Sequence, residues 1–281
     1  AAFCGVYGHK PSGLLVPNQG HCPPATGEID RYLCAGPMTR SARDLWPLLN
    51  ALSGPYQNET SGEWSHHRSL EERAPIDFSK LVVYPLPTTG RFPVSKTMHQ
   101  AIKRAADELV SRGASLAELN EPRLKKAFEI WSAMLAGADG PSYAEILGVH
   151  APINVGAEWV RWFKRQSVHT APGLLMATAE YLPKLAPNYA AKMVSLGREL
   201  QVELETVLGD NGVLLHPPYS RVAPHHHFAW ATPFHAACTA IFNVMEFPST
   251  QMPMGLDRKG MPVGIQIVGK RGQDAMTIQL S

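Results

Sequence analysis

Residues 81–119, LVVYPLPTTGRFPVSKTMHQAIKRAADELVSRGASLAEL, decide the fold class. The apolar run 81–84 predicts a buried strand. Ser95 is a candidate N-cap for a helix over 96–112, and 114–119 predicts a second strand. A strand, a helix and a strand in this order form a right-handed βαβ unit, which builds parallel or mixed sheets.

The same alternation continues along the chain. A polar surface connection is expected over 57–77. Further helices are expected over 42–52, 122–136 and 188–208, and further strands over 213–215 and 263–268. In the first of these helices, leucines at three- and four-residue steps predict one core-facing stripe: Leu45, Leu48, Leu49 and Leu52. We therefore expect an α/β fold, a single domain over 1–281 whose mixed β-sheet core is flanked by helices on both faces.

Composition bounds the class of protein. The 281 residues are 44% hydrophobic, which is enough for a sizeable core. The formal charge is +2, from 26 basic and 24 acidic residues, so there is no electrostatic case for nucleic-acid binding. No apolar run reaches the roughly 18 residues of a transmembrane segment. The four cysteines form no CxxC pair and are expected to be reduced thiols: Cys4, Cys22, Cys34 and Cys238.

The chain offers weak candidates for a catalytic or metal site of its own. A Ser-His-Asp or Cys-His arrangement stays open, because such sets are recognised by geometry, but there is no GxSxG elbow. Cys238 follows His235 by three residues and could pair with it, although a small core thiol is favoured. The histidines at 225–227 and 66–67 suggest a metal, but adjacent histidines point in different directions, which favours solvated loops and no metal site.

Aromatic and basic side chains alternate over 157–165. Trp159, Trp162 and Phe163 recur at helical steps beside Arg161 and Lys164. Such a pattern fits a helix that lies in a membrane interface. It also fits a helix that packs its tryptophans on the core, and the residues alone favour that second interpretation.

Three blocks, punctuated by glycine and proline, carry a family resemblance. They are AFCGVYGHKPS at 2–12, CAGPMTRSARDL at 34–45, and a closing stretch from TAIFN at 239–243 to PVGIQIVG at 262–269. In their order and spacing they resemble the C-terminal two-thirds of an amidase-signature hydrolase, most closely the fatty-acid amide hydrolase 2 branch. His9, residues 209–213 and residues 222–226 are the cues for that branch.

The resemblance implies amide hydrolysis by acyl transfer. In this family a serine, activated through a second serine and a lysine, attacks the amide, while backbone amides hold the oxyanion. Those groups lie upstream of the first block, so no catalytic residue is carried onto this sequence and the chain alone is expected to be inactive. No cofactor is implied. Residues 2–6 would continue the helix that leaves the nucleophile turn, packed by Phe3 and Val6, and 8–12 would form a turn.

The resemblance also implies substrate-binding positions. Candidates for the wall of the acyl pocket are Thr239, Ile241, Phe242 and Met245. Asn243 is a candidate for an orienting hydrogen bond beneath it, and Trp131 and Met134 for the access route. Ordinary core packing is an even alternative for Ile241 and Met245. A helical hydrophobic cap is expected at about 155–187, which tips Trp159, Trp162 and Phe163 toward the membrane-interface interpretation.

Three functions remain open. The first is a lipid-amide hydrolase; the second is a soluble small-molecule amidase or a glutamine-type amidotransferase subunit; the third is a non-catalytic remnant that keeps the scaffold. The expected partners are a lipid amide substrate and a membrane surface, with a homodimer left open and no nucleic acid. We expect an intracellular protein whose full-length parent associates with membranes.

Overall fold

The computed structural model describes residues 1–18, 20–21, 27–53, 74–138, 140–148, 151–181, 185–226, 235 and 237–281. Several features named above lie outside these residues. They are Cys22, the 66–67 pair, His227 and most of the expected connection over 57–77.

In the described part of the chain, seven strands form one mixed sheet in the order β2-β1-β6-β7-β5-β3-β4. The strands are β1 (Tyr7–Lys10), β2 (Met38–Thr39), β3 (Val82–Pro85), β4 (Ser115–Leu116), β5 (Gly212–His216), β6 (Ser249–Leu256) and β7 (Pro262–Val268). Strand β3 pairs in parallel with β4 and β5, and the remaining pairs are antiparallel. The four strands expected from the sequence therefore share one sheet, and the βαβ unit is confirmed.

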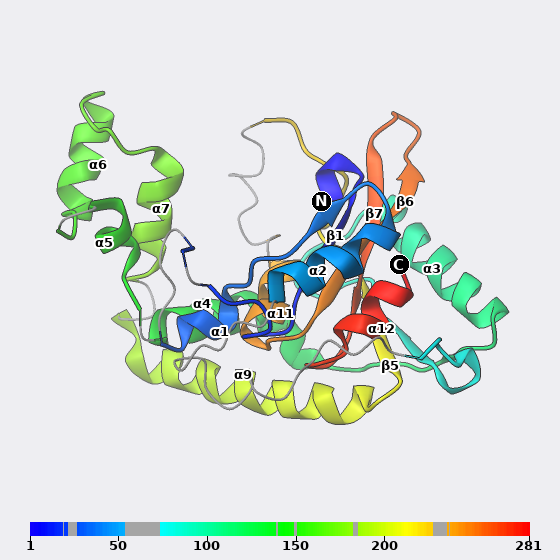
Figure 1. Ribbon diagram of the computed structural model, residues 1–281. Helices are drawn as coiled ribbons and strands as arrows, with labels where there is room; N and C mark the ends of the chain where they lie inside the picture. The colour runs from blue at the N-terminus through cyan, green and yellow to red at the C-terminus, as the bar shows by residue number, and fades with distance from the viewer. Residues whose placement is uncertain are drawn as a thin grey trace.

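Helices surround this sheet (Figure 1). The α-helices are α1 (Ile29–Tyr32), α2 (Leu45–Ser53), α3 (Lys96–Ser111), α4 (Ala127–Gly137), α5 (Tyr143–Gly148), α6 (Val155–Phe163), α7 (Ala171–Ala179), α9 (Pro187–Leu208), α11 (Ala237–Val244) and α12 (Asp274–Gln279). The described residues also contain four 3-10 helices, which are η1 (Ala2–Cys4), η2 (Ala42–Asp44), η3 (Phe78–Lys80) and η4 (Pro122–Lys126). The expected helices over 42–52 and 122–136 thus each begin with a 3-10 segment.

Helix α3 begins and ends as its sequence predicts. The Oγ atom of Ser95 accepts a hydrogen bond from the backbone N–H of Met98, which caps the first turn. After the helix, Gly113 adopts a φ of +111°, a conformation that side chains with a Cβ rarely adopt.

Both faces of the sheet are covered, because alternate strand residues point to different layers. On one face, Leu214 and Val268 join the buried side chains of α4, α9 and α11. On the other, Leu215 and Ile267 pack with α3 and with Met276 of α12. The expected α/β fold with helices on both faces of the sheet is confirmed.

The core-facing stripe of α2 is narrower than predicted. Leu45 and Leu49 are fully buried, but Leu48 and Leu52 are 44% and 43% exposed. The hydrophobic cluster beneath α2 is small, with Val16 and Ile278 as its other buried members. It covers one pair of leucines a single turn apart instead of the whole stripe.

The N-terminal segment differs from the expectation. A single 3-10 turn, η1, replaces the helix over 2–6, since Gly5 ends it in the left-handed region at φ +65°. Phe3 is 44% exposed, and its ring contacts Tyr219 edge-on at 5.3 Å between centroids. The expected turn over 8–12 begins instead inside strand β1, whose residues pair with β2 and β6.

Among the described helices, none is both long and apolar enough to cross a membrane.

Candidate functional site

Most of the predicted pocket-wall residues lie together in one apolar layer. Ile241 and Phe242 of α11 and Met245 just after it are at most 1% exposed, in the same cluster as Met134 of α4. Trp131 of α4 is partly buried against that cluster. The sequence therefore identified side chains that meet in space, and their position suits ordinary core packing as well as a pocket wall.

Two predicted residues of α11 lie apart from this layer. Thr239 is exposed, and Asn243 is partly buried. Next to α11, the ring of His216 meets the ring of Phe242 edge-on at 5.6 Å. The Nδ1–H of His216 donates to the carbonyl oxygen of Leu86 at 2.6 Å, and burial lowers the pKa of His216 to about 4. The imidazole is therefore neutral and fixed in one tautomer.

A chain of ring contacts links the N-terminal segment to the start of α11. Phe3 meets Tyr219, Tyr219 meets His235 at 5.5 Å, and His235 stacks on Phe92 at 4.9 Å. The Nδ1 atom of His235 shares a hydrogen bond with the hydroxyl of buried Ser220. Burial, with a smaller contribution from Arg221, lowers the pKa of His235. The four rings therefore form a continuous row of contacts that includes His235, just before α11.

Cys238 is a buried thiol. It is 1% exposed, and burial raises its pKa to about 12, so it stays protonated. His235 makes its hydrogen bond with Ser220. The interpretation of Cys238 as a small core thiol is confirmed. Cys4 and Cys34 are also free thiols.

The predicted membrane-interface residues lie on an arm formed by α5, α6 and α7, which stands away from the sheet in Figure 1. The rings of Trp159, Trp162 and Phe163 contact one another, with centroids 5.4 to 6.1 Å apart. Trp159 is partly buried and donates from Nε1 to the hydroxyl of Thr178 on α7 at 2.9 Å. Phe163, by contrast, is 75% exposed.

Other large apolar side chains of the arm are also exposed. They are Val160, Val168, Leu175, Met176, Tyr181 and, just beyond, Leu185. The charged group that the arm buries is Glu158, whose carboxylate accepts from Ser167 Oγ at 2.8 Å and from Arg161 at 2.6 Å. The bond from Ser167 contributes most to lowering the pKa of Glu158. An open pocket of about 610 Å³ lies between residues 152–156 and the end of α7.

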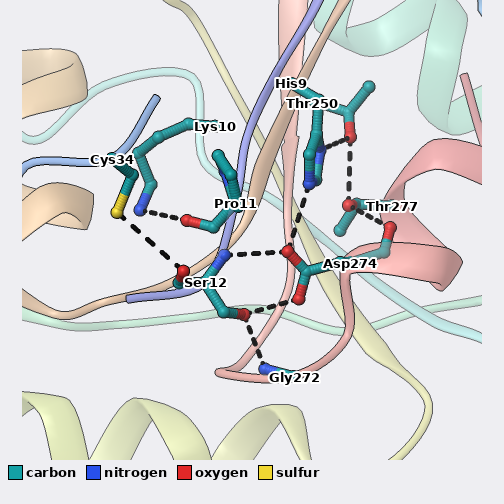
Figure 2. Close-up of polar contacts among 9 residues, drawn as sticks. All are labelled: His9, Lys10, Pro11, Ser12, Cys34, Thr250, Gly272, Asp274 and Thr277. Carbon is teal, nitrogen blue, oxygen red and sulfur yellow. Dashed lines mark hydrogen bonds and ion pairs between the residues drawn. The ribbon is translucent and has the colours of Figure 1, made fainter. Parts of the chain in front are cut away.

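A buried polar cluster joins the interior strands β1 and β6 to helix α12 (Figure 2). The ring of His9 contacts Thr250 Oγ1 through Nδ1 at 2.8 Å and Asp274 Oδ1 through Nε2 at 3.1 Å. Ser12 donates to the same carboxylate from its backbone N–H and its hydroxyl, at 2.8 and 2.6 Å. Burial alone raises the pKa of Asp274, but the bonds from His9 and Ser12 outweigh it and lower the pKa overall.

Lys10 and Cys34 lie beside this cluster (Figure 2). Lys10 Nζ donates to the carbonyl oxygen of Pro11 at 2.8 Å. Burial lowers the pKa of Lys10, against smaller raising effects of Cys34, Asp274 and Glu246, and burial raises the pKa of Cys34. Burial thus disfavours the charged form of both side chains.

His9 was expected from the sequence only as a family cue, and its partners were not predicted. Thr250 and Asp274 lie 241 and 265 positions further along the chain. Asp274 closely follows Gly272 and begins the mostly apolar helix α12, which was a usable signal for a helix start. Nothing in the sequence, however, pairs Asp274 with His9. Within the described residues, no group of three or more His, Cys, Asp or Glu side chains could hold a metal ion.

Comparison with known proteins defines the class. The Amidase family model matches residues 1–278, so the chain belongs to the amidase family. Among curated proteins it is 34% identical to fatty-acid amide hydrolase 2-A of Danio rerio, over 98% of this chain and 52% of that protein. It is 24% identical to a subunit of the glutamyl-tRNA(Gln) amidotransferase of Exiguobacterium sibiricum, over 98% of this chain and 58% of the relative.

Comparison with solved structures finds the same fold. The structure of 6-aminohexanoate cyclic dimer hydrolase superposes with a TM-score of 0.72 at 20% identity, over 99% of this chain and 59% of that one. This likeness concerns the fold alone. The chain spans about half the length of the curated relatives it matches, 52% in the first case and 58% in the second.

Proposed function

We propose that this chain is the scaffold and substrate-binding part of an amide hydrolase that acts on lipid amides. In this proposal a serine attacks the amide carbonyl, the amine leaves, and water releases the fatty acid from the acyl-serine. The attacking serine and its activating serine and lysine come from outside residues 1–281. Membership of the amidase family supports the reaction type, and the 34% identity to a fatty-acid amide hydrolase supports the substrate class.

The observation that carries the substrate class is the apolar surface of the arm. Phe163 and Val168 are 75% and 91% exposed, and neither packs on the sheet. Large apolar side chains that are exposed together mark a binding surface for apolar partners. A small, soluble amide would not require such a surface.

We assign the wall of the acyl pocket to α11 and α4. Ile241, Phe242 and Met245 would contact the fatty chain from one side, and Met134 and Trp131 would line its approach. Thr239, which is exposed, would meet the more polar end of the substrate. Asn243 would orient its neighbours by a hydrogen bond. Apolar walls of this kind bind long chains through the area they remove from water.

The arm would bring the pocket to a lipid surface. Trp162 and Phe163 lie beside the exposed basic side chains Arg161, Lys164 and Arg165. Aromatic rings enter the interfacial region of a bilayer, while basic groups attract anionic headgroups by about 1 kcal/mol each. Substrate could then reach the pocket without crossing water.

One other function has specific support, and a third stays open without it. The 24% identity to an amidotransferase subunit favours a small-amide or glutamine-type amidase. A non-catalytic scaffold would also keep this fold without the reacting groups. The substrate preference and the labelling pattern of the protein separate these functions.

The test uses two proteins, residues 1–281 alone and the same chain extended upstream of Ala1. Each is assayed against oleamide and acetamide and treated with a fluorophosphonate that labels reactive serines. We expect the shorter protein to be inactive and unlabelled, and the longer one to be labelled and to prefer oleamide. Stoichiometric labelling with turnover in the shorter protein would place the nucleophile within residues 1–281 and overturn the proposal. A preference for acetamide would favour the second function.

A further inference from the structure

The buried cluster around His9 has a proton arrangement that can be traced atom by atom (Figure 2). Thr277 has one hydroxyl proton, and it donates that proton to the carbonyl oxygen of Asp274 at 3.0 Å. The 3.0 Å bond between Thr250 and Thr277 must then use the proton of Thr250. With its proton committed, Thr250 can only accept from His9, so the Nδ1 atom of His9 carries a hydrogen.

The carboxylate of Asp274 is likewise committed. The hydroxyl of Ser12 accepts from the N–H of Gly272 at 2.8 Å and donates to Oδ2 of Asp274 at 2.6 Å. The backbone N–H of Ser12 donates to Oδ1 at 2.8 Å. Both carboxylate oxygens are therefore acceptors, and short bonds of this kind are typical of an ionised carboxylate.

The Nε2 atom of His9 lies 3.1 Å from this carboxylate, at Oδ1. If His9 were neutral with its hydrogen on Nδ1, the lone pair of Nε2 would face an oxygen lone pair inside the protein. The side chain of His9 is fully buried, so water cannot relieve that repulsion. A second ring hydrogen on Nε2 turns the same contact into a charge-assisted hydrogen bond.

We propose that His9 is held as an imidazolium with both N–H groups engaged, and that its buried ion pair with Asp274 clamps strand β1 to helix α12. The clamp joins the first ten residues of the chain to the last eight. It acts on position and does not touch a substrate. The inference is independent of amide hydrolysis and is tested without an activity assay.

Three titratable groups other than Asp274 lie near the clamp: Lys10, Glu246 and Cys34. Lys10, next to His9 on β1, opposes a second positive charge, although burial lowers its own pKa. Glu246, after α11, favours a positive ring but is itself paired with Arg31 at 3.0 Å. Cys34 stays a protonated thiol because burial raises its pKa. The direct partner of the ring remains Asp274 on α12.

The first test is nitrogen-15 NMR of the histidine rings in the folded protein at pH 7.5. We expect both ring nitrogens of His9 to carry a hydrogen, and the exposed His99 on α3 serves as the comparison ring in the same spectrum. The variant H9Q assigns the signals by their loss. If H9Q does not fold, contacts between the ring and the methyl group of Thr250 assign them in the wild type. A bare Nε2 atom on His9 at pH 7.5 overturns the proposal.

The second test is unfolding in urea between pH 6.5 and 8.5. Above pH about 6.5 an unfolded histidine releases its proton, while the clamped ring keeps it, so stability falls as the pH rises. We expect the unfolding constant of the wild type to rise up to about tenfold per pH unit more steeply than that of H9Q. The control H99Q should follow the wild type. Equal pH slopes for the wild type and H9Q contradict the clamp.

Discussion

Gly36 lies against strand β1 so closely that a Cβ atom on it would be 2.0 Å from the carbonyl oxygen of His9. The next residue, Pro37, accepts a hydrogen bond from the backbone N–H of His9 at 3.0 Å. The absence of a side chain at Gly36 is therefore a packing requirement next to strand β1. No L-residue other than glycine fits without moving β1.

The first prediction is that Gly36→Ala destabilises the protein. A methyl group forced onto backbone shifts the strand, and overpacking of this kind costs about 1–3 kcal/mol or more. Thermal or urea unfolding measures the loss. The matched control is Gly137→Ala at the end of α4, where an added Cβ meets no atom within 4 Å. Equal stability of the two variants would contradict the packing role of Gly36.

The second prediction separates core from surface on α11. Phe242 is 1% exposed, so Phe242→Ala should cost about 3–5 kcal/mol of unfolding free energy. Thr239 is exposed one turn earlier, and Thr239→Ala should stay within about 0.5 kcal/mol. If the proposed pocket is correct, Thr239→Ala nevertheless changes KM for long-chain amides in the longer, active protein. A stability loss for Phe242→Ala below about 1 kcal/mol would mean that the side chain faces a void.

The third prediction concerns acid stability. Burial lowers the pKa of His216 to about 4, below its value of about 6.5 in an unfolded chain. The unfolded state therefore binds a proton first, and stability present above pH 6.5 is lost as the pH falls toward 4. We expect the wild type to lose up to about 3 kcal/mol over this range relative to His216→Asn, whose side-chain amide can still donate to Leu86.

The control for this prediction is His226→Asn, because His226 is exposed. That variant should lose stability in acid as the wild type does. If His216→Asn also follows the wild type between pH 6.5 and 4, the ring of His216 becomes charged in the folded protein, which would contradict a neutral, buried imidazole at this position.

The fourth prediction tests the arm. Trp162→Ser with Phe163→Ser should reduce co-sedimentation with vesicles of mixed neutral and anionic lipid several-fold. The reason is the loss of two large apolar side chains next to Arg161 and Lys164. The control is Val202→Ser, which removes a side chain 64% exposed on α9. Unchanged sedimentation of the folded double variant would remove the interfacial proposal.

The regular part of the fold was predictable because its signals are local. The βαβ unit from β3 to β4 and the long helix α9 repeat apolar residues at fixed steps, and Ser95 and Gly113 mark the two ends of α3. Strands β1, β2 and β6 were missed. Strand β6 contains Pro253 and Gly255, which normally mark a break, and β1 has no apolar alternation.

The candidate site was predictable only in part. Apolar pattern and resemblance together selected Ile241, Phe242 and Met134, which do meet. The partners of His9 could not be found in this way, because a single polar side chain gives no sign of which distant residue it meets. The exposure of Leu48 could not be predicted either, since it depends on how large the hydrophobic cluster beneath α2 is.

The position of β1 also shapes how the chain folds during synthesis. His9 sits on an interior strand, yet its neighbour Thr250 on β6 is 241 positions later. At about 5–20 residues per second, a ribosome needs roughly 12–50 seconds to reach that partner. Among the strands that the structure describes, only the short β2 can pair with β1 through that interval, and the other edge of β1 stays open to wrong partners. The pairing of β1 with β6 should therefore be a slow and late step of folding.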